Sequence, residues 1–364
     1  MSDTQQATAP ESPPPSRVFI TRLTAALALI ALTSLAVMLP VPYITLRPGP
    51  VFDTLGDFEG QPMFTFGDDV TTYPTTGSLD FTTVRVASAS GKVSLVEAIE
   101  AYLDDDVAVV PRSLIYPDGT TAETSRQQSA AQLDGSKDSS RVAALRAAGF
   151  TVPGTPQVAE VSSDGAAADL LETGDLIRSV DGVDVDSSQE TVDAVGSVEP
   201  GDTVSLDVTR DGTDRTVDVV TRPDTVDPSI PRIGVSLSTR YDFPIDIENN
   251  VGDTVGGPSA GMMFALAIYD RLTPGSLTGG LRVAGTGEIS ADGVVGQIGG
   301  IQQKIAGAAS DDVSVFLVPA ANCAEALDGD TKDLELVEVA TLDDAIDALT
   351  ALADDPDAEV PLCS

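Results

Sequence analysis

The sequence predicts an α+β protein with a single N-terminal transmembrane helix, a β-rich middle domain and a mixed α+β domain after it. Three features lead to this prediction. An uncharged apolar stretch runs from Leu23 to Leu39, valine-rich segments separated by turns fill residues 157–221, and a hairpin pattern runs into a helical pattern at residues 282–309. At 364 residues and 42% hydrophobic content, the chain has material for two or three cores.

The N-terminal region divides into a tail and an apolar segment. Residues 1–16 are rich in Pro, Ser, Thr and Gln, which is typical of a disordered tail. The apolar stretch that follows is near the roughly 20 residues that cross a bilayer. We therefore expect residues 17–39 to form a single-pass anchor in the cell membrane, with residues 18–39 contacting the lipid bilayer.

Flanking residues predict the topology of this anchor. Arg17 and Arg22 favour a cytoplasmic N-terminus, which places everything after Pro40 outside the cytoplasm. The alternative is a cleaved signal peptide, whose apolar region is shorter and ends at a site of small residues. Pro40-Val41-Pro42 follows the stretch instead, and this favours the uncleaved anchor.

Charge and composition exclude several classes of function. Lys and Arg number 20 against 57 Asp and Glu, a net charge of −37, so the surface repels phosphate backbones and no nucleic acid partner is expected. The chain has no histidine, which removes the Ser-His-Asp triad, the Cys-His dyad and the HExxH metal site together. Its two cysteines are too few for a structural zinc cluster. We expect no metal or cofactor, and any hydrolytic chemistry must use carboxylates or a lysine base. The lysines are Lys92, Lys137, Lys304 and Lys332.

Residues 41–150 predict an extracytoplasmic α+β connector. The segment SLVEAIEAYLD predicts a helix in which Leu95, Ile99, Tyr102 and Leu103 share one face. A second helix is expected from about residue 125 to 148, with a break near Gly135 and an end at Gly149. Neither helix carries a predicted chemical role.

Residues 151–225 contain a recognisable pattern of motifs. Gly174-Asp175-Leu176-Ile177 is followed by Asp181-Gly182, and Pro200-Gly201-Asp202 precedes another strand pattern. This segment resembles a bacterial-type PDZ domain. The resemblance implies that the domain captures an extended peptide, usually a C-terminus, as an added strand at a sheet edge. The alternative is a degenerate PDZ domain that serves only as a spacer, because no glycine-hydrophobic-glycine turn precedes Val158.

The sequence GGPSAG at residues 256–261 precedes an apolar helix pattern. Small residues around Ser259 let a substrate backbone approach, and Pro258 favours the first helical turn. Ser259 would then lie at a helix N-terminus, where backbone N–H groups can stabilise an oxyanion. Taken alone, such a segment is more often an ordinary capped helix.

Lys304 lies in the first turns of the helix predicted to begin near Gly300. Its neighbours at helical spacing are apolar, namely Ile298, Ile301, Ile305 and Ala308. An ammonium among isoleucines is disfavoured, so its pKa should fall towards the range of a general base. A surface lysine on an amphipathic helix fits less well, because Gln302 and Gln303 already supply a polar face.

Together these motifs resemble the proteolytic domain of the Lon family, over roughly residues 230–352. The resemblance rests on four motifs: PSAG, LTGG, the GEIS hairpin and IGG-x-x-x-K. The resemblance implies that Ser259 is the nucleophile, Lys304 the base and Thr278 the group that orients the lysine, with Gly257 and the Ser259 N–H contributing to the oxyanion site. Many Lon proteins carry an acidic residue where this chain has Gly256, a departure that concerns the control of lysine basicity.

The order of the three segments resembles the bacterial membrane-anchored Lon-like proteases with a PDZ domain. This implies an ATP-independent serine endopeptidase that cleaves unfolded or flexible extracytoplasmic polypeptides, since no G-x-x-x-x-G-K-[ST] motif occurs. It also implies a homo-oligomer, as a six-membered ring. Two alternatives stay open: a non-catalytic membrane scaffold that binds peptides through the PDZ domain, and a selective processing protease for one regulatory partner.

Residues 353–364 are expected to form a C-terminal tail. Cys323 and Cys363 would both lie outside the cytoplasm, where a disulfide could join this tail to the preceding domain. The alternative is a free buried Cys323 with a loose tail.

Overall fold

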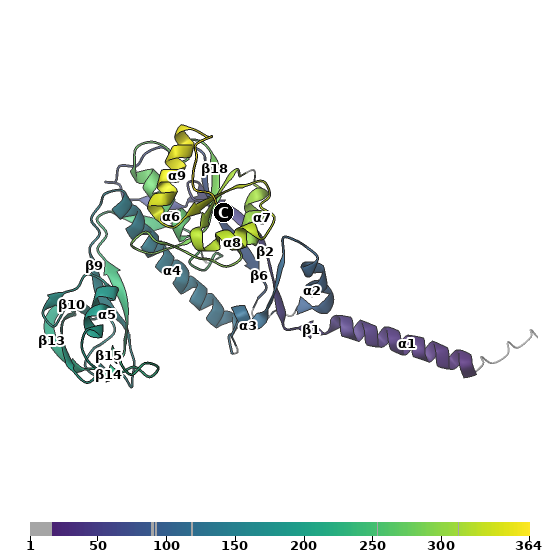
Figure 1. Cartoon of the computed structure of the whole chain (residues 1–364), viewed down its shortest axis with the longest axis horizontal. Helices are drawn as coiled ribbons and strands as arrows, with labels where there is room; N and C mark the ends of the chain where they lie inside the picture. Colours follow the sequence, from purple (N-terminus) through teal and green to yellow (C-terminus); the bar gives the residue numbers. More distant parts are fainter. Residues whose placement is uncertain (1–16, 89–90, 92, 118, 253, 312) are drawn as a thin grey trace, which may run out of the picture.

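The computed structural model describes residues 17–364 except 89–90, 92, 118, 253 and 312 (Figure 1). The predicted tail, residues 1–16, lies outside the described residues. The fold is a mixed α/β arrangement with two main sheets, and the long helix α4 (Ala122–Ala147) runs between the regions that contain them.

The N-terminal helix corrects one prediction. Helix α1 spans Arg17–Met38 and extends away from the rest of the chain in Figure 1. In the part of the chain that the structure describes, no helix reaches the length and apolar character that a bilayer crossing requires. Arg22, Thr21 and Thr24 interrupt the apolar surface of α1, and both threonine hydroxyls donate to backbone carbonyls of the same helix. The predicted transmembrane anchor at residues 17–39 is therefore wrong.

The larger sheet is built from segments far apart in the sequence. Its strand order is β22-β21-β18-β6-β2-β8. Strands β6, β18, β21 and β22 are parallel, and β2 is antiparallel to both β6 and β8. The strands are β2 (Tyr43–Asp53), β6 (Ser78–Val86), β8 (Ala108–Pro111), β18 (Arg282–Gly285), β21 (Val315–Pro319) and β22 (Glu335–Val339).

Alternating side chains divide the core between the two faces of this sheet. Val283, Leu317 and Val337 point into a core shared with α4, α6 (Gly261–Leu272) and α9 (Leu342–Asp354). Their neighbours Ala284 and Phe316 join a second core with α7 (Ile301–Ala309) and α8 (Cys323–Leu327). The sheet is thus buried on both faces, and α6 and α7 lie on opposite sides of it.

The smaller sheet has the order β13-β12-β10-β9-β16, and all its neighbours are antiparallel. Its core is rich in valine and leucine and includes Val158, Leu171, Val204 and Leu206. The elements are β9 (Gly154–Val161), β10 (Leu176–Val180), β11 (Val183–Asp184), α5 (Ser188–Gly196), β12 (Thr203–Arg210), β13 (Thr213–Val220) and β16 (Val235–Tyr241).

These sheets revise the predicted domain boundaries. Strands β2, β6 and β8 come from the predicted connector at residues 41–150, yet they are part of the larger sheet. Strand β16 lies beyond the boundaries predicted at residues 225 and 230, and pairs with β9 in the smaller sheet. The smaller domain, residues 154–241, is therefore inserted into the larger one. Strand pairing between distant segments leaves no local sequence signal, which is why the linear division failed.

The two helices predicted in the connector region form, with differences in detail. Helix α2 (Leu95–Tyr102) begins after Ser94, whose hydroxyl accepts from the N–H of Glu97. Its buried residues are Ala98 and Ala101, whereas the predicted apolar face is exposed. Helix α4 runs without a break through Gly135 and ends before Gly149, which has φ +87°.

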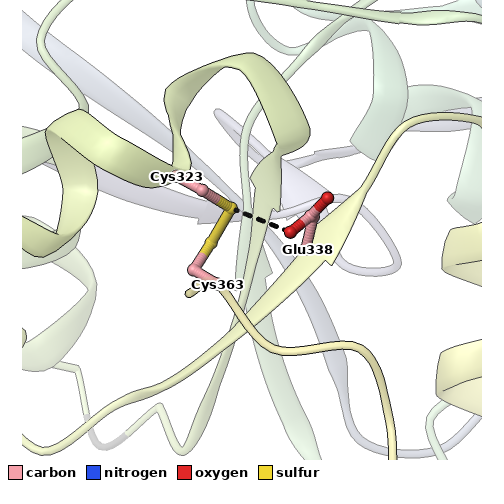
Figure 2. Close-up of a disulfide and its surroundings, with 3 residues drawn as sticks. All are labelled: Cys323, Glu338 and Cys363. Carbon is pink, nitrogen blue, oxygen red and sulfur yellow. Dashed lines mark hydrogen bonds between the residues drawn. A yellow bond between two sulfur atoms is a disulfide. The ribbon is translucent and has the colours of Figure 1, made fainter.

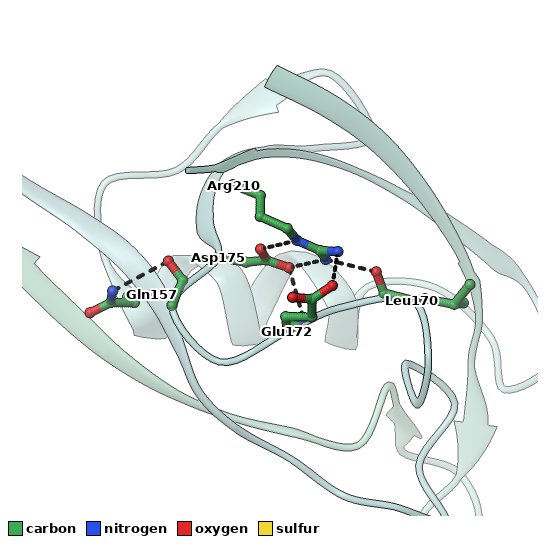
Figure 3. A network of polar contacts seen from close by, with 6 residues as sticks. Gln157, Leu170, Glu172, Asp175 and Arg210 are labelled. Atoms are coloured by element: carbon green, nitrogen blue, oxygen red, sulfur yellow. Dashed lines mark hydrogen bonds and ion pairs between the residues drawn. The ribbon is translucent and has the colours of Figure 1, made fainter. Parts of the chain in front are cut away.

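A buried ion pair holds the turn before β10 (Figure 3). The Asp175 side chain is fully buried and accepts from Arg210 Nε at 2.7 Å and Nη2 at 2.6 Å. Arg210 also binds the Glu172 carboxylate and the Leu170 carbonyl. Burial alone would raise the pKa of Asp175, but hydrogen bonds from Arg210 and the Glu172 N–H lower it below its ordinary value. The aspartate of the Gly-Asp motif thus joins two distant parts of the small domain.

The predicted disulfide is present (Figure 2). Cys323 of α8 is bonded to Cys363, with a Cα–Cα distance of 5.1 Å, and Glu338 contacts the Cys323 Sγ at 3.8 Å. The tail forms a bridge to β22 at Val337 and Leu362. The prediction that a disulfide joins the tail to the preceding domain is confirmed.

The remaining elements are short pieces at the periphery of the two sheets. They are β1 (Pro40–Val41), β3 (Asp57–Phe58), β4 (Gln61–Pro62), β5 (Phe64–Phe66), β7 (Val93–Ser94), α3 (Arg112–Ile115), β14 (Arg222–Pro223), β15 (Pro231–Arg232), β17 (Ile247–Asn249), β19 (Glu288–Ile289), β20 (Val295–Gly296) and η1 (Ala320–Asn322).

Candidate active site

Ser259 and Lys304 meet at one end of the larger sheet. Ser259 lies in the turn that leads into α6, two residues before the first helical residue, and Lys304 lies in the first turn of α7. The Nζ of Lys304 is 2.8 Å from the Oγ of Ser259. Ser259 precedes α6 and Lys304 belongs to α7, two helices on opposite faces of the sheet, so the fold brings the two side chains together beyond the end of its strands.

Lys304 is buried, and the groups that its amine contacts are uncharged. The residue is 3% exposed, and its Nζ also contacts the Thr286 hydroxyl at 2.8 Å and the Thr82 carbonyl at 3.2 Å. All three partners are neutral, so nothing compensates fully for the lost hydration of an ammonium. Burial therefore lowers the pKa of Lys304 to about 7, within reach of a general base at neutral pH.

Thr286 connects both members of this pair. Its hydroxyl donates to the carbonyl oxygen of Ser259 at 2.9 Å and accepts from Lys304. The backbone N–H of Gly287 donates to the same carbonyl at 2.9 Å. Thr286 thus fixes the lysine relative to the backbone of the serine.

Thr278 does not contact Lys304, although the resemblance to the Lon family implied that it orients the lysine. Its hydroxyl donates to the carbonyl of Thr76 and accepts from the N–H of Gly280, so it closes a turn away from Lys304. Thr286 was missed although it lies at the carboxyl end of β18, directly before the GEIS hairpin. Its position directly after a central strand was the sequence feature that could have identified it as a site residue.

The neighbours before Ser259 contact α4. The N–H of Gly257 donates to the Ser129 carbonyl at 2.9 Å, so in this structure it is already engaged and does not contribute to an oxyanion site. The carbonyl of Pro258 accepts from the Ser136 hydroxyl at 3.0 Å. The predicted contribution of the Ser259 N–H stays a prediction.

A cavity of about 540 Å³ opens beside the two side chains. Part of its wall is β6, whose residues 78–81 pair with β18, whereas residues 82–86 extend past the last β18 pair. Phe52 and Val255 are apolar members of the rest of the wall, which also includes Thr254 and several glycines. An extended chain could pair with this part of β6 and lie across Ser259.

Two families of known proteins match segments of the chain. The Lon protease (S16) C-terminal proteolytic domain family matches residues 244–352, and the PDZ domain family matches residues 132–221. The chain joins a Lon-type proteolytic domain to a PDZ domain. The predicted combination of these two domains is confirmed.

Two relatives match parts of the chain. The Lon protease of Phenylobacterium zucineum is 37% identical over 120 residues, which is 32% of this chain and 15% of that protein. A probable periplasmic serine endoprotease DegP-like from Halomonas elongata is 42% identical over 72 residues, 20% of this chain and 15% of that protein. The chain therefore matches about 15% of the length of each relative.

Solved PDZ domains are also similar in sequence. The PDZ domain of an SdrC-like protein from Listeria monocytogenes is 35% identical and covers 24% of this chain and 90% of that one, with a TM-score of 0.22. The PDZ domain of an SdrC-like protein from Listeria innocua is 31% identical and covers 23% of this chain and 92% of that one, with a TM-score of 0.22.

Gly256 of the Lon-type domain lies against α4. A Cβ at this position would be 2.9 Å from the Ser129 Cβ, closer than such atoms approach in folded proteins. An acidic side chain here would require α4 to move. The close approach of α4 therefore gives a steric reason why this chain has glycine where many Lon proteins have an acidic residue.

The PDZ domain carries a second cavity, of about 410 Å³, between β16 and α5. Thr191, Val192 and Val195 line one side, and residues 233–237 line the other. Strand β16 pairs with β9 on one side and is the last strand of its sheet. Gly234, with φ +80°, lies between Ile233 and the start of β16, near the end of the domain and not before Val158.

Proposed function

We propose that this chain is a serine endopeptidase in which Ser259 is the nucleophile and Lys304 the general base. The observation that carries the proposal is the 2.8 Å contact between the Nζ of the buried Lys304 and the Oγ of Ser259, which lines a cavity. A lysine whose pKa is about 7 is largely neutral at mildly alkaline pH and can accept a hydroxyl proton.

The reaction would proceed in two halves. Neutral Lys304 accepts the proton of Ser259 Oγ as the oxygen bonds to the scissile carbonyl carbon. When the C–N bond breaks, the lysine ammonium gives this proton to the leaving amine, and an acyl ester stays on Ser259. Water then loses a proton to Lys304 and attacks the ester, and the proton returns to Ser259 Oγ as the acid leaves. Thr286 acts as the positioning residue by holding Lys304 and the Ser259 carbonyl together.

The substrates we propose are unfolded or flexible polypeptides, cleaved without ATP. The free part of β6 and the cavity beside it favour an extended chain as the substrate. The edge of β16 could capture such a chain by strand addition and present it to the protease site. We also propose action outside the cytoplasm, because a disulfide persists in oxidising compartments. A six-membered ring stays a proposal by resemblance to Lon.

Hydrolysis of fluorescently labelled casein by the full chain, without ATP, tests the catalytic proposal. Ser259→Ala and Lys304→Ala should abolish cleavage, whereas the control Lys332→Ala should retain it, because Lys332 forms ion pairs with Asp106 and Asp330 away from the site. Cleavage that survives in Ser259→Ala would overturn the assignment. A wild type that cleaves nothing would favour the peptide-binding scaffold or a selective protease.

The capture proposal has its own test. Val192→Lys places a charge in the groove beside β16, while Val220→Lys changes a similarly exposed valine on β13. Anisotropy of a labelled decapeptide ending in valine should report weaker binding only for Val192→Lys. Equal binding by both variants would show that the groove does not take the peptide.

A further inference from the structure

The turn that carries Ser259 is held from outside the serine-lysine pair. The Ser136 hydroxyl of α4 donates to the carbonyl of Pro258 at 3.0 Å, and Ser136 is 5% exposed. This carbonyl belongs to the peptide bond that joins Pro258 to Ser259. A buried hydrogen bond here restricts the rotation of that peptide plane.

Ser136 also lies against the start of α6. A Cβ added to Gly261, the first residue of the helix, would be 2.6 Å from the Ser136 Oγ. Glycine at this position lets α6 approach α4 closely. Ser136 therefore contacts the chain on both sides of Ser259.

The opposite side of the turn is fixed separately. The Ser259 carbonyl accepts from the Thr286 hydroxyl and from the Gly287 N–H, each at 2.9 Å. These bonds hold one peptide plane of Ser259. Ser136 holds the other together with the Gly261 N–H, which donates to the Pro258 carbonyl at 3.2 Å. Displacement of a reacting atom by about 1 Å can reduce a rate by about a hundredfold.

We propose that Ser136 is a positioning residue for the nucleophile: it fixes the Pro258–Ser259 peptide so that the Ser259 hydroxyl stays within hydrogen-bond reach of Lys304. This inference rests on the proposed function. It assigns a role in the reaction to a helix that lies outside the matched Lon-type segment, residues 244–352.

The same helix supplies a matched control. Ser140, one turn further along α4, is fully buried, and its hydroxyl donates to the Lys137 carbonyl within the helix. The two serines have the same side chain and similar burial. They differ in whether the hydroxyl reaches the turn that carries Ser259.

The proposal is tested by measuring kcat and KM of Ser136→Ala and Ser140→Ala on labelled casein. Rates are normalised to the concentration of folded enzyme. Ser136→Ala should lower kcat about fivefold with KM unchanged, because one neutral hydrogen bond to the turn is lost. The pH midpoint should stay that of the wild type, since the contacts of Lys304 are intact. Ser140→Ala should stay within about twofold of the wild type in kcat. Equal losses of kcat in both variants, or a change in the KM of Ser136→Ala with no change in kcat, would overturn the positioning role of Ser136.

Amide hydrogen exchange gives a readout that does not need proteolysis. The N–H groups of Gly261 and Met262 bond to the carbonyls of Pro258 and Gly287. They should exchange faster in Ser136→Ala than in Ser140→Ala. Cleavage that survives in Ser259→Ala would overturn the catalytic proposal. Unchanged exchange in Ser136→Ala, which is measured without any substrate, would separately overturn the positioning role.

Discussion

The Nζ of Lys304 lies 2.8 Å from the Oγ of Ser259 although 45 residues separate them in the chain. The lysine is buried among apolar residues of α7, and its partners are hydroxyls and one carbonyl. The serine is therefore in direct contact with a lysine that burial keeps largely unprotonated above neutral pH.

Cleavage should rise with pH and level off above a midpoint near 7. Burial lowers the pKa of Lys304 to about 7, and only its neutral form accepts the serine proton. The dependence of kcat/KM on pH, between pH 5 and 9.5, measures this midpoint. Lys304→Arg should be inactive across the whole range, because arginine stays protonated. A flat profile for the wild type would contradict a lysine base.

Lys304→Met should stabilise the folded protein. The unfolded lysine has its ordinary pKa of 10.5, so between about pH 7 and 10 the unfolded chain binds more protons and wild-type stability rises with pH. The variant lacks this buried charge and should gain on the order of 3 kcal/mol at pH 6. Urea unfolding at pH 6 and pH 10 should show the gain shrinking at the higher pH. A gain that is the same at both values would argue against the shifted lysine.

Thr286→Val should lower kcat by about tenfold to a hundredfold, because the Thr286 hydroxyl no longer bonds to Lys304, which becomes an ammonium as it accepts the serine proton. Thr278→Val is the matched control: both threonines are fully buried, but the Thr278 hydroxyl bonds to Thr76. The control should affect thermal stability more than kcat. A larger loss of kcat in Thr278→Val than in Thr286→Val would instead assign the orienting role to Thr278.

Gly256→Ala should destabilise the Lon-type domain by about 1–3 kcal/mol through its contact with Ser129. Gly135→Ala is the control, because a Cβ there meets no atom within 4 Å in the middle of α4. It should stabilise by up to about 1 kcal/mol. Chemical denaturation of both variants and of Ser129→Gly/Gly256→Ala measures the effect. No recovery in the double variant would assign the cost to another contact.

Asp175→Asn should destabilise the PDZ domain by about 3–5 kcal/mol, because Arg210 would keep a largely buried charge without its carboxylate partner. The pKa of Asp175 is lowered in the folded state, despite the opposing effect of burial, so its stabilisation is present above the unfolded pKa of 3.8 and is lost as pH falls below it. Thermal unfolding from pH 7 to pH 2.5 should show a smaller acid-dependent loss in the variant than in the wild type.

Much of the site could be predicted from the sequence, since its residues lie in short motifs. The GGPSAG turn, the apolar setting of Lys304 and the start of α7 at Gly300 depend on local chemistry, and all three occur where expected. Thr286 could not be separated from Thr278 in this way. Both precede glycines, and only strand order shows which one lies beside α7.

The sequence by itself determined the chemistry that is possible: the lack of histidine leaves carboxylates or a lysine base, and the motifs specify the two domain types. Tertiary structure alone decided that the supposed connector supplies strands to the larger sheet, that the PDZ domain is inserted at residues 154–241, and that α4 hydrogen-bonds to the turn that carries Ser259. It also overturned the membrane anchor. The reason is physical: local propensities and motifs depend on neighbours in the chain, whereas sheet order and helix contacts depend on the burial of distant apolar surfaces.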